Sequence, residues 1–110
     1  AGGAQPGQIP AALAGGHADS RVLQEHGQRM IKRDFRTGAP IRNFVKDLNT
    51  VLQTAGELGV KLPIVEAVRD TFQELYDKGL TQHDHSAFLL HLEEMSAPVR
   101  LGDGEDTVPE

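Results

Sequence analysis

The stretch IRNFVKDLNTVLQTAGELGVKLP, residues 41–63, reads as one amphipathic helix followed by a stop. Its apolar residues recur every three or four positions, which places them on one helical face: Ile41, Val45, Leu48, Leu52 and Ala55, flanked by Phe44, Val51 and Leu58. Gly59 favours the end of a helix, and Pro63 suits the first turn of the next one. The stretch therefore predicts a helix from Ile41 to about Gly59 with a buried apolar face.

The opposite face of this helix is polar. It carries Lys46 together with Arg42, Asn43, Asn49, Thr50 and Gln53. Asp47 follows Lys46 directly, so the two side chains have two interpretations. They are either ordinary solvated surface, in which Asp47 contacts Arg42 or Lys46, or Lys46 is directed at a partner that the chain itself does not contain.

Helical patterns also precede this stretch. Residues 6–16 predict a short helix that stops at the Gly15-Gly16 pair. In the next pattern Asp19 or Ser20 is placed to cap a helix. Its apolar residues recur near helical spacing: Val22, Leu23, His26, Met30 and Ile31. Gly38 and Pro40 then mark a loop before residue 41.

Two further helices follow it. The first, about residues 63–78, has an apolar face of Ile64, Val65, Val68, Phe72 and Leu75. The second begins near Asp84 or His85, stops before Pro98 and has an apolar face of Ala87, Phe88, Leu89, Leu92 and Met95. No run alternates apolar and polar residues as a half-buried strand does. We therefore predict an all-α fold, a compact bundle of about five helices, without a Rossmann domain.

With 110 residues, the chain is long enough for one small domain with a modest core. Residues 1–5 begin without Met in a Gly-rich stretch, and we expect them to be the flexible N-terminal end of a truncated chain. Residues 6–98 are expected to form the all-α domain. Residues 99–110 are acidic and unpatterned, which predicts a flexible tail.

The net charge of −5 and the lack of a basic stripe argue against a nucleic-acid surface. The chain has no cysteine, which fits a reducing compartment. No apolar run approaches the roughly 18 residues that a membrane-spanning helix needs. We therefore expect a soluble cytoplasmic protein that binds neither nucleic acid nor membrane.

Polar residues near the last helix invite a catalytic or metal-binding interpretation that their spacing does not favour. His83, Asp84, His85 and His91 lack the usual helical spacing of a metal-binding pair, and we expect them to act as a cap and in packing, so no metal site is predicted. Ser86 has no base at a motif spacing, which argues against a nucleophile. His17 and His26 are expected at the surface or in packing.

Three blocks of sequence resemble a known family when taken together. SRVLQEHGQRMIKRDF (20–35), KDLNTVLQTAGELGVKLP (46–63) and ELYDKGLTQHDHSAF (74–88) follow one another as in the C-terminal domain of the β-hydroxyacid dehydrogenase family. The resemblance covers about residues 13–95. It implies the helical C-terminal domain of a 6-phosphogluconate-dehydrogenase-like enzyme, preceded in the full-length protein by an N-terminal Rossmann domain and an interdomain helix.

The resemblance also implies an activity for the whole enzyme. Such enzymes move a hydride between NAD or NADP and a small hydroxyacid substrate. The family's catalytic lysine lies on the interdomain helix in a G-x-x-G-x-x-x-K-x-x-N context, which this sequence lacks. The resemblance thus implies an oxidoreductase domain that is inactive alone, binds no cofactor by itself and holds no catalytic residue.

Residue by residue, Lys46 matches the lysine of the family's K-D-L motif, which contacts the cofactor across the interdomain cleft. Asp47 matches the neighbouring acid and is expected to border the substrate cleft or to hold Lys46 in place. Ala39 departs from the family, which often has an aromatic residue after the loop glycine. The helices of this domain also pair subunits in the family, so a homo-oligomer is expected.

Two other classes of function compete with the reductase domain. One is a stand-alone helical interaction module, which would have no Rossmann reading frame joined to Ala1. The other is a helical DNA-binding domain, which the acidic charge disfavours and which salt-sensitive DNA retention would reveal.

Overall fold

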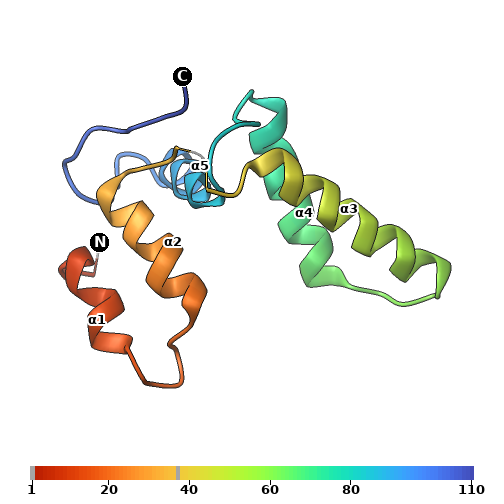
Figure 1. Cartoon of the computed structure of the whole chain (residues 1–110), viewed down its shortest axis with the longest axis horizontal. Helices are drawn as coiled ribbons and strands as arrows, with labels where there is room; N and C mark the ends of the chain where they lie inside the picture. The colour runs from red at the N-terminus through yellow and green to blue at the C-terminus, as the bar shows by residue number, and fades with distance from the viewer. Residues whose placement is uncertain (1, 37) are drawn as a thin grey trace. The chain divides into compact units, whose positions relative to one another are not determined.

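A computed structural model describes residues 2–36 and 38–110. These residues contain five α-helices and two short 3-10 helices, with isolated bridges but no strand (Figure 1). In chain order the elements are η1 (Pro6–Gln8), α1 (Ile9–Leu13), α2 (Arg21–Lys32), α3 (Ile41–Glu57), α4 (Pro63–Asp77), η2 (His85–Ala87) and α5 (Phe88–Met95). The predicted all-α fold of five helices is confirmed.

The helices belong to two compact units. One consists of Ala1–Arg36 and Ser86–Glu110, and the other is the continuous segment Thr37–His85. The first unit therefore contains α1, α2 and α5, and the second contains α3 and α4. The predicted domain boundaries at residues 6 and 98 and the flexibility of both ends stay predictions.

In the continuous unit, α3 and α4 pack along each other and are joined by residues 58–62 (Figure 1). Val45 and Phe72 are buried between the helices, and the ring of Phe72 meets that of Phe44 edge to face at 4.8 Å between centroids. Such a pair contributes about 0.5–1.5 kcal/mol beyond its buried area. Gly59, with φ of 70°, turns the chain after α3, as its position after the apolar pattern predicts.

The start of α2 is fixed by a side-chain cap. Of the two predicted cap residues, Ser20 performs this role, because its Oγ accepts a hydrogen bond from the Leu23 amide at 2.9 Å. Asp19 instead accepts from the Gly15 amide at 2.8 Å, which lowers the pKa of its carboxyl. Arg33 ends α2 in the left-handed region, with φ of 52°.

The C-terminal segment returns to the end of α2. The Phe35 amide donates to the Thr107 carbonyl at 2.8 Å, and the Thr107 amide donates to the Arg33 carbonyl at 2.9 Å. These bonds form an isolated parallel bridge between Asp34 and Thr107. Residues near 107 thus have backbone partners that their acidic, unpatterned sequence does not predict.

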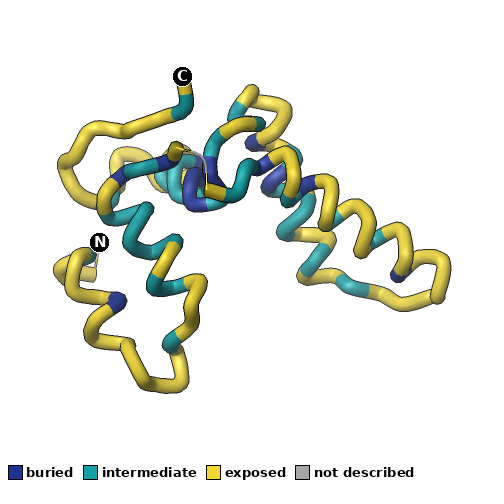
Figure 2. The backbone as a smooth tube through the Cα atoms, viewed as in Figure 1, coloured by how far each residue is buried: buried dark blue, intermediate teal, exposed yellow. Residues whose placement is uncertain are grey.

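Several apolar residues that the periodicity placed on buried faces are exposed, and those expectations are wrong. Figure 2 shows dark blue only at isolated positions along α3 and α4. Exposed fractions are 78% for Ile64, 72% for Met95 and 65% for Val22. Leu58, Val51 and Leu92 are exposed too. The reason is that periodicity identifies the apolar side of a helix but not whether another element covers it.

None of the helices in the described part of the chain is both long enough and apolar enough to cross a bilayer.

Candidate functional site

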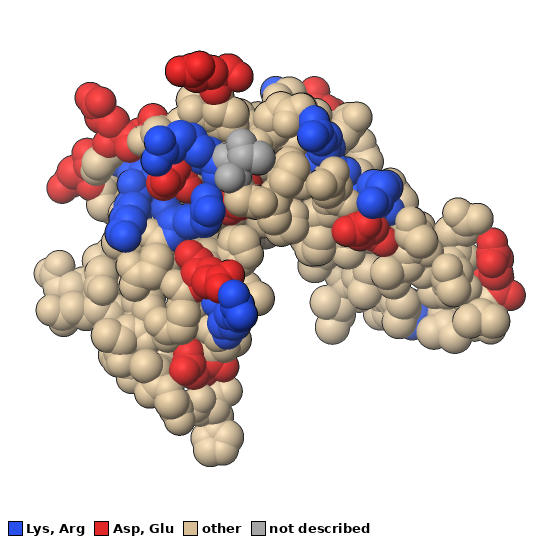
Figure 3. Space-filling model, in the orientation of Figure 1, with Lys and Arg blue, Asp and Glu red and all other residues tan. Residues whose placement is uncertain are grey.

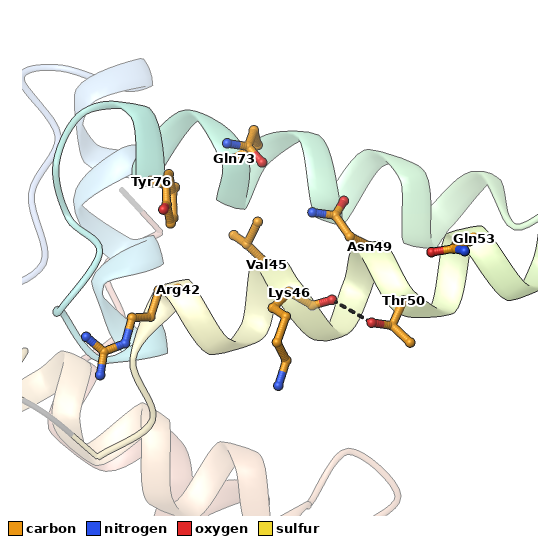
Figure 4. A pocket seen from close by; sticks show the side chains of 8 residues that line it. All are labelled: Arg42, Val45, Lys46, Asn49, Thr50, Gln53, Gln73 and Tyr76. Atoms are coloured by element: carbon orange, nitrogen blue, oxygen red, sulfur yellow. Dashed lines mark hydrogen bonds between the residues drawn. The ribbon is translucent and has the colours of Figure 1, made fainter.

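A polar groove runs along α3 and α4 in the continuous unit. Its volume is about 500 Å³, and Figure 4 shows the side chains that line it. Six of them come from α3 and two from α4: Arg42, Val45, Lys46, Asn49, Thr50, Gln53, Gln73 and Tyr76. Lys46, the predicted cofactor residue, is therefore part of a groove and not of a flat surface.

The helical repeat explains why these residues meet. Positions 42, 46, 49, 50 and 53 follow one another at steps of one, three and four, so they form a stripe along one side of α3. The stripe adjoins the buried positions Ile41, Val45 and Ala55. Burial of that apolar face against α4 turns the polar stripe toward the groove. Five of the six residues of the predicted polar face line it; Asn43 does not.

Lys46 and Asp47 form an ion pair, with 3.1 Å between Nζ and Oδ1. Their side chains are 72% and 64% exposed. Asp47 is not among the groove's lining residues, so the structure places it next to the lysine but outside the groove. Exposed pairs of this kind contribute about 0–1 kcal/mol. Lys46 is therefore not fixed by a strong internal partner.

The charge of the groove differs from that of the whole chain. The chain carries a net charge of −5, yet the eight lining residues include two cations and no acid. Figure 3 shows basic side chains over the first part of α3, with an acidic group against one of them. Charged and neutral N–H and O–H donors of this kind favour an anionic group, and the lining offers no carboxylate to a cation.

The start of α3 is held by a buried carboxylate. Oδ1 of Asp84, which is fully buried, accepts hydrogen bonds from the amides of Ala39 at 2.9 Å and Gly38 at 3.2 Å. The Ile41 amide also donates to the His83 carbonyl at 2.9 Å. These bonds fix where α3 begins, and so where Arg42 and Lys46 lie.

This role of Asp84 differs from the cap of the last helix that the sequence suggested. α5 begins after Ala87 without a side-chain cap. Sequence reasoning missed the contact because Asp84 is 45 residues from Ala39. The one available signal was an acidic residue next to the loop expected between two helices.

The histidines near α5 act in packing. The ring of His85 lies against Phe44 at 4.4 Å and near Phe72 at 6.1 Å between centroids. Burial lowers the pKa of His83. The predicted packing role is therefore confirmed for His85, and no group of three or more potential metal ligands occurs among residues 2–36 and 38–110.

The unit with α2 and α5 contains a second charged cluster. Arg33 is a buried residue, 1% exposed, and its guanidinium donates two hydrogen bonds of 2.8 Å to Glu93 and also pairs with Asp106. The Leu101 amide donates to Glu93 at 2.7 Å. The Glu93 carboxylate raises the pKa of Arg33, and Arg33 lowers that of Glu93. Every charge in the cluster has a partner, so its role is structural.

The comparison with protein families matches residues 1–92 to the family described as NAD-binding of NADP-dependent 3-hydroxyisobutyrate dehydrogenase. The match includes α1 to α4 and most of α5. It therefore contains the whole groove with Lys46.

Two curated relatives agree with the family match. The 2-hydroxy-3-oxopropionate reductase of Escherichia coli (strain K12) is 44% identical over 94 residues, which are 86% of this chain and 32% of that protein. The probable 3-hydroxyisobutyrate dehydrogenase-like 1, mitochondrial, of Arabidopsis thaliana is 32% identical over 85 residues, 77% of this chain and 25% of that protein. The chain thus spans a third or less of the length of these relatives.

The helical fold and a match over residues 1–92 lead to the same conclusion. The resemblance to β-hydroxyacid dehydrogenases that the three sequence blocks indicated is confirmed. The chain belongs to the family of the NAD-binding domain of NADP-dependent 3-hydroxyisobutyrate dehydrogenase.

Proposed function

We propose that the chain is the C-terminal helical domain of an NAD(P)-dependent β-hydroxyacid oxidoreductase that resembles 2-hydroxy-3-oxopropionate reductase. It forms one wall of the cofactor and substrate cleft, and an N-terminal Rossmann domain of the same enzyme forms the other. Its helices also contribute contacts between the subunits of a homo-oligomer. Family membership and 44% identity to the bacterial reductase support this proposal.

The observation that carries the proposal is the polar groove with Lys46. In this proposal Lys46 donates a charge-assisted hydrogen bond to the cofactor. Asp47 borders the substrate cleft and stays next to Lys46 in a solvent-exposed ion pair of 3.1 Å. The bound nicotinamide supplies or accepts the hydride. The lysine that exchanges a proton with the substrate oxygen belongs to the interdomain helix and lies outside this sequence.

A 3-hydroxyisobutyrate dehydrogenase activity is the second candidate. The description of the family and the name of the plant relative favour it. The two activities differ in the substrate, so kinetics with 2-hydroxy-3-oxopropionate and 3-hydroxyisobutyrate separate them. A stand-alone interaction module is the third candidate, and the gene sequence immediately upstream of Ala1 separates it from both enzymes.

The proposal predicts that Lys46→Ala weakens cofactor use in the full-length enzyme. A charge-assisted hydrogen bond contributes about 1.5–3 kcal/mol, so kcat/KM for the cofactor is expected to fall about ten- to a hundredfold. The melting temperature is expected to stay the same, because Lys46 is exposed and lies outside the core. Steady-state kinetics with NAD and NADP, together with thermal melts, test both expectations.

Lys61→Ala is the matched control, because Lys61 is an exposed lysine of the same unit that does not line the groove. Equal kinetic constants for the Lys46→Ala variant and the parent would show that Lys46 is a surface residue without a role in cofactor binding. The isolated 110-residue chain is expected to give no heat of binding with NAD or NADP in calorimetry and no reductase activity. Immobilising a free ligand costs about 4–15 kcal/mol, which the groove alone does not offset at the micromolar ligand concentrations of this measurement.

A further inference from the structure

Arg42 is the second cation of the groove, and its side chain has no partner among residues 2–36 and 38–110. It is exposed, and its guanidinium makes no hydrogen bond or ion pair with the residues that the structure describes. It lies four positions before Lys46, which is slightly more than one helical turn, or about 6 Å along the axis of α3. Figure 4 shows the two side chains leaving neighbouring turns of this helix. The helical repeat places Arg42 on the polar face of α3, and the resemblance to the family implies no ligand contact for it.

The other polar side chains of the groove divide into engaged and available donors. Gln53 donates to Glu57 at 3.1 Å, and Gln73 donates to Asp77 at 2.9 Å. Thr50 donates to the carbonyl of Lys46. One N–H of each glutamine amide and the threonine hydroxyl proton are thus already used within the protein.

Asn49 and Tyr76 keep a donor for a ligand. Oδ1 of Asn49 accepts from Arg69 at 3.0 Å, which leaves its Nδ2 donor free of that bond. The hydroxyl of Tyr76, a residue that is 40% exposed, has no partner among residues 2–36 and 38–110. The groove therefore offers a guanidinium, an ammonium, an amide N–H and a phenol, with no acidic side chain among its lining residues.

The ion pair of Lys46 with Asp47 does not cancel this charge. Both side chains are more than half exposed, so solvent screens their attraction. A ligand that receives hydrogen bonds from Arg42 and Lys46 together has two charged donors, and a guanidinium binds the paired oxygens of a phosphate or carboxylate with two parallel hydrogen bonds.

We propose that Arg42 and Lys46 together bind an oxyanion of the ligand, and that Asn49 and Tyr76 complete its hydrogen bonds. The proposal rests on the proposed function for its biological source, which is either a phosphate of the dinucleotide or the carboxylate of the hydroxyacid. Arg42 is thereby a ligand-binding residue of the same groove as Lys46.

Nuclear magnetic resonance of the 110-residue chain tests the oxyanion site without reference to catalysis. Sodium pyrophosphate and sodium D-glycerate are the two probes, each titrated to tens of millimolar against sodium chloride of equal ionic strength. The Nε–H signal of Arg42 and the Nδ2 signals of Asn49 are expected to shift and saturate with at least one probe. Arg42→Gln is expected to remove the saturable shift of Asn49.

Arg21→Gln is the matched control. Arg21 is an exposed arginine of α2 that pairs with Glu25, and it belongs to the other unit. It is expected to leave the titration unchanged. Shifts that sodium chloride reproduces, that do not saturate, or that persist in Arg42→Gln would overturn the oxyanion site.

Kinetics of the full-length enzyme then identify the source of the oxyanion. Arg42→Gln is expected to raise the KM of one ligand about tenfold, with partial rescue by Arg42→Lys. A higher KM for NAD or NADP assigns the oxyanion to the cofactor phosphate, and a higher KM for the hydroxyacid assigns it to the substrate carboxylate. Unchanged values for both ligands would overturn the proposal.

The two arms also separate this inference from the proposed function. If the full-length protein transfers no hydride but the pyrophosphate titration behaves as expected, the reductase function fails and the oxyanion site stands. If the enzyme is active and its kinetics depend on Lys46 but not on Arg42, the proposed function stands and the ligand-binding role of Arg42 is wrong.

Discussion

At the scale of single residues, Asp84 and Lys46 contribute to the site in different ways. Lys46 offers its charge to the groove, whereas Asp84 has its carboxylate buried against the loop that precedes α3. A buried carboxylate is costly unless hydrogen bonds satisfy it, and the amides of Gly38 and Ala39 do so. The position of the polar stripe on α3 therefore depends on Asp84, a residue that does not line the groove.

Asp84→Ala is expected to lower the free energy of unfolding by about 1.5–3 kcal/mol, because two amides lose a charged acceptor. Asp84→Asn keeps one acceptor oxygen and is expected to lose less. Urea unfolding monitored by circular dichroism measures both values, with Asp103→Ala as the exposed control. Equal losses of unfolding free energy for the two variants would show that the oxygen acceptor at position 84 does not stabilise the loop of Gly38 and Ala39.

Local patterns predict some of these residues and not others. The stripe that contains Lys46 follows from the helical repeat, so the sequence alone locates it. No local pattern predicts the acidic partners of Arg33, because Glu93 and Asp106 are 60 and 73 residues away from it along the chain. Contacts of that separation depend on how the chain folds back, which spacing along one helix does not encode.

At the scale of elements, the end of α3 has an apolar surface that the rest of the described chain does not cover. A second groove of about 380 Å³ lies there, lined by Thr50, Val51, Thr54, Ala55, Leu58, Val60 and Leu62. Leu58 is 73% exposed, and Val51 and Val60 are each nearly half exposed. The helical repeat predicted the apolar side of α3 correctly but could not show that this end of it stays open.

This surface predicts self-association of the chain. Sedimentation at micromolar concentration is expected to show a dimer or a larger assembly, because contiguous apolar surface mediates such contacts. Leu58→Asp is expected to shift the mass toward the monomer with little change in stability, since exposed substitutions usually cost less than about 0.5 kcal/mol. Val22→Asp, at an exposed apolar residue of α2, is the control. A parent chain that sediments only as a monomer contradicts the prediction.

At the scale of the whole molecule, the two ends of the sequence meet in one unit. Arg33 at the end of α2 pairs with Glu93 of α5 and with Asp106 of the C-terminal segment. The composition of residues 99–110 predicts flexibility, and that stays a prediction. Hydrogen exchange at the amides of Phe35 and Thr107 tests this flexibility, because both amides donate hydrogen bonds between the C-terminal segment and the end of α2.

The Arg33 cluster predicts a loss of stability in acid. Arg33 holds the pKa of Glu93 below its ordinary value of 4.5 in the folded state. The ionised form therefore stabilises the fold fully above about pH 4.5, and this contribution is lost as the pH falls through the lower folded pKa. Glu93→Gln is expected to cost about 1.5–3 kcal/mol at pH 6 and progressively less below pH 4.5.

Urea unfolding from pH 6 to pH 3 measures the difference between the parent and the Glu93→Gln variant. Glu25→Gln, which removes the exposed partner of Arg21, is expected to show a small difference at every pH. A gap between the parent and Glu93→Gln that does not narrow in acid would show that the Glu93 charge does not stabilise this unit.

The continuous unit Thr37–His85 interrupts the sequence of the other unit, and its two ends are hydrogen-bonded to each other. The His85 amide donates to the Ala39 carbonyl at 3.0 Å, so the chain leaves this unit close to where it entered. Segments with neighbouring ends tolerate insertion and exchange between proteins. The α3–α4 hairpin is therefore a segment that can be exchanged between related proteins as a unit. A graft of this segment into a related enzyme would transfer the groove with Arg42 and Lys46 as one block, through two junctions that lie next to each other.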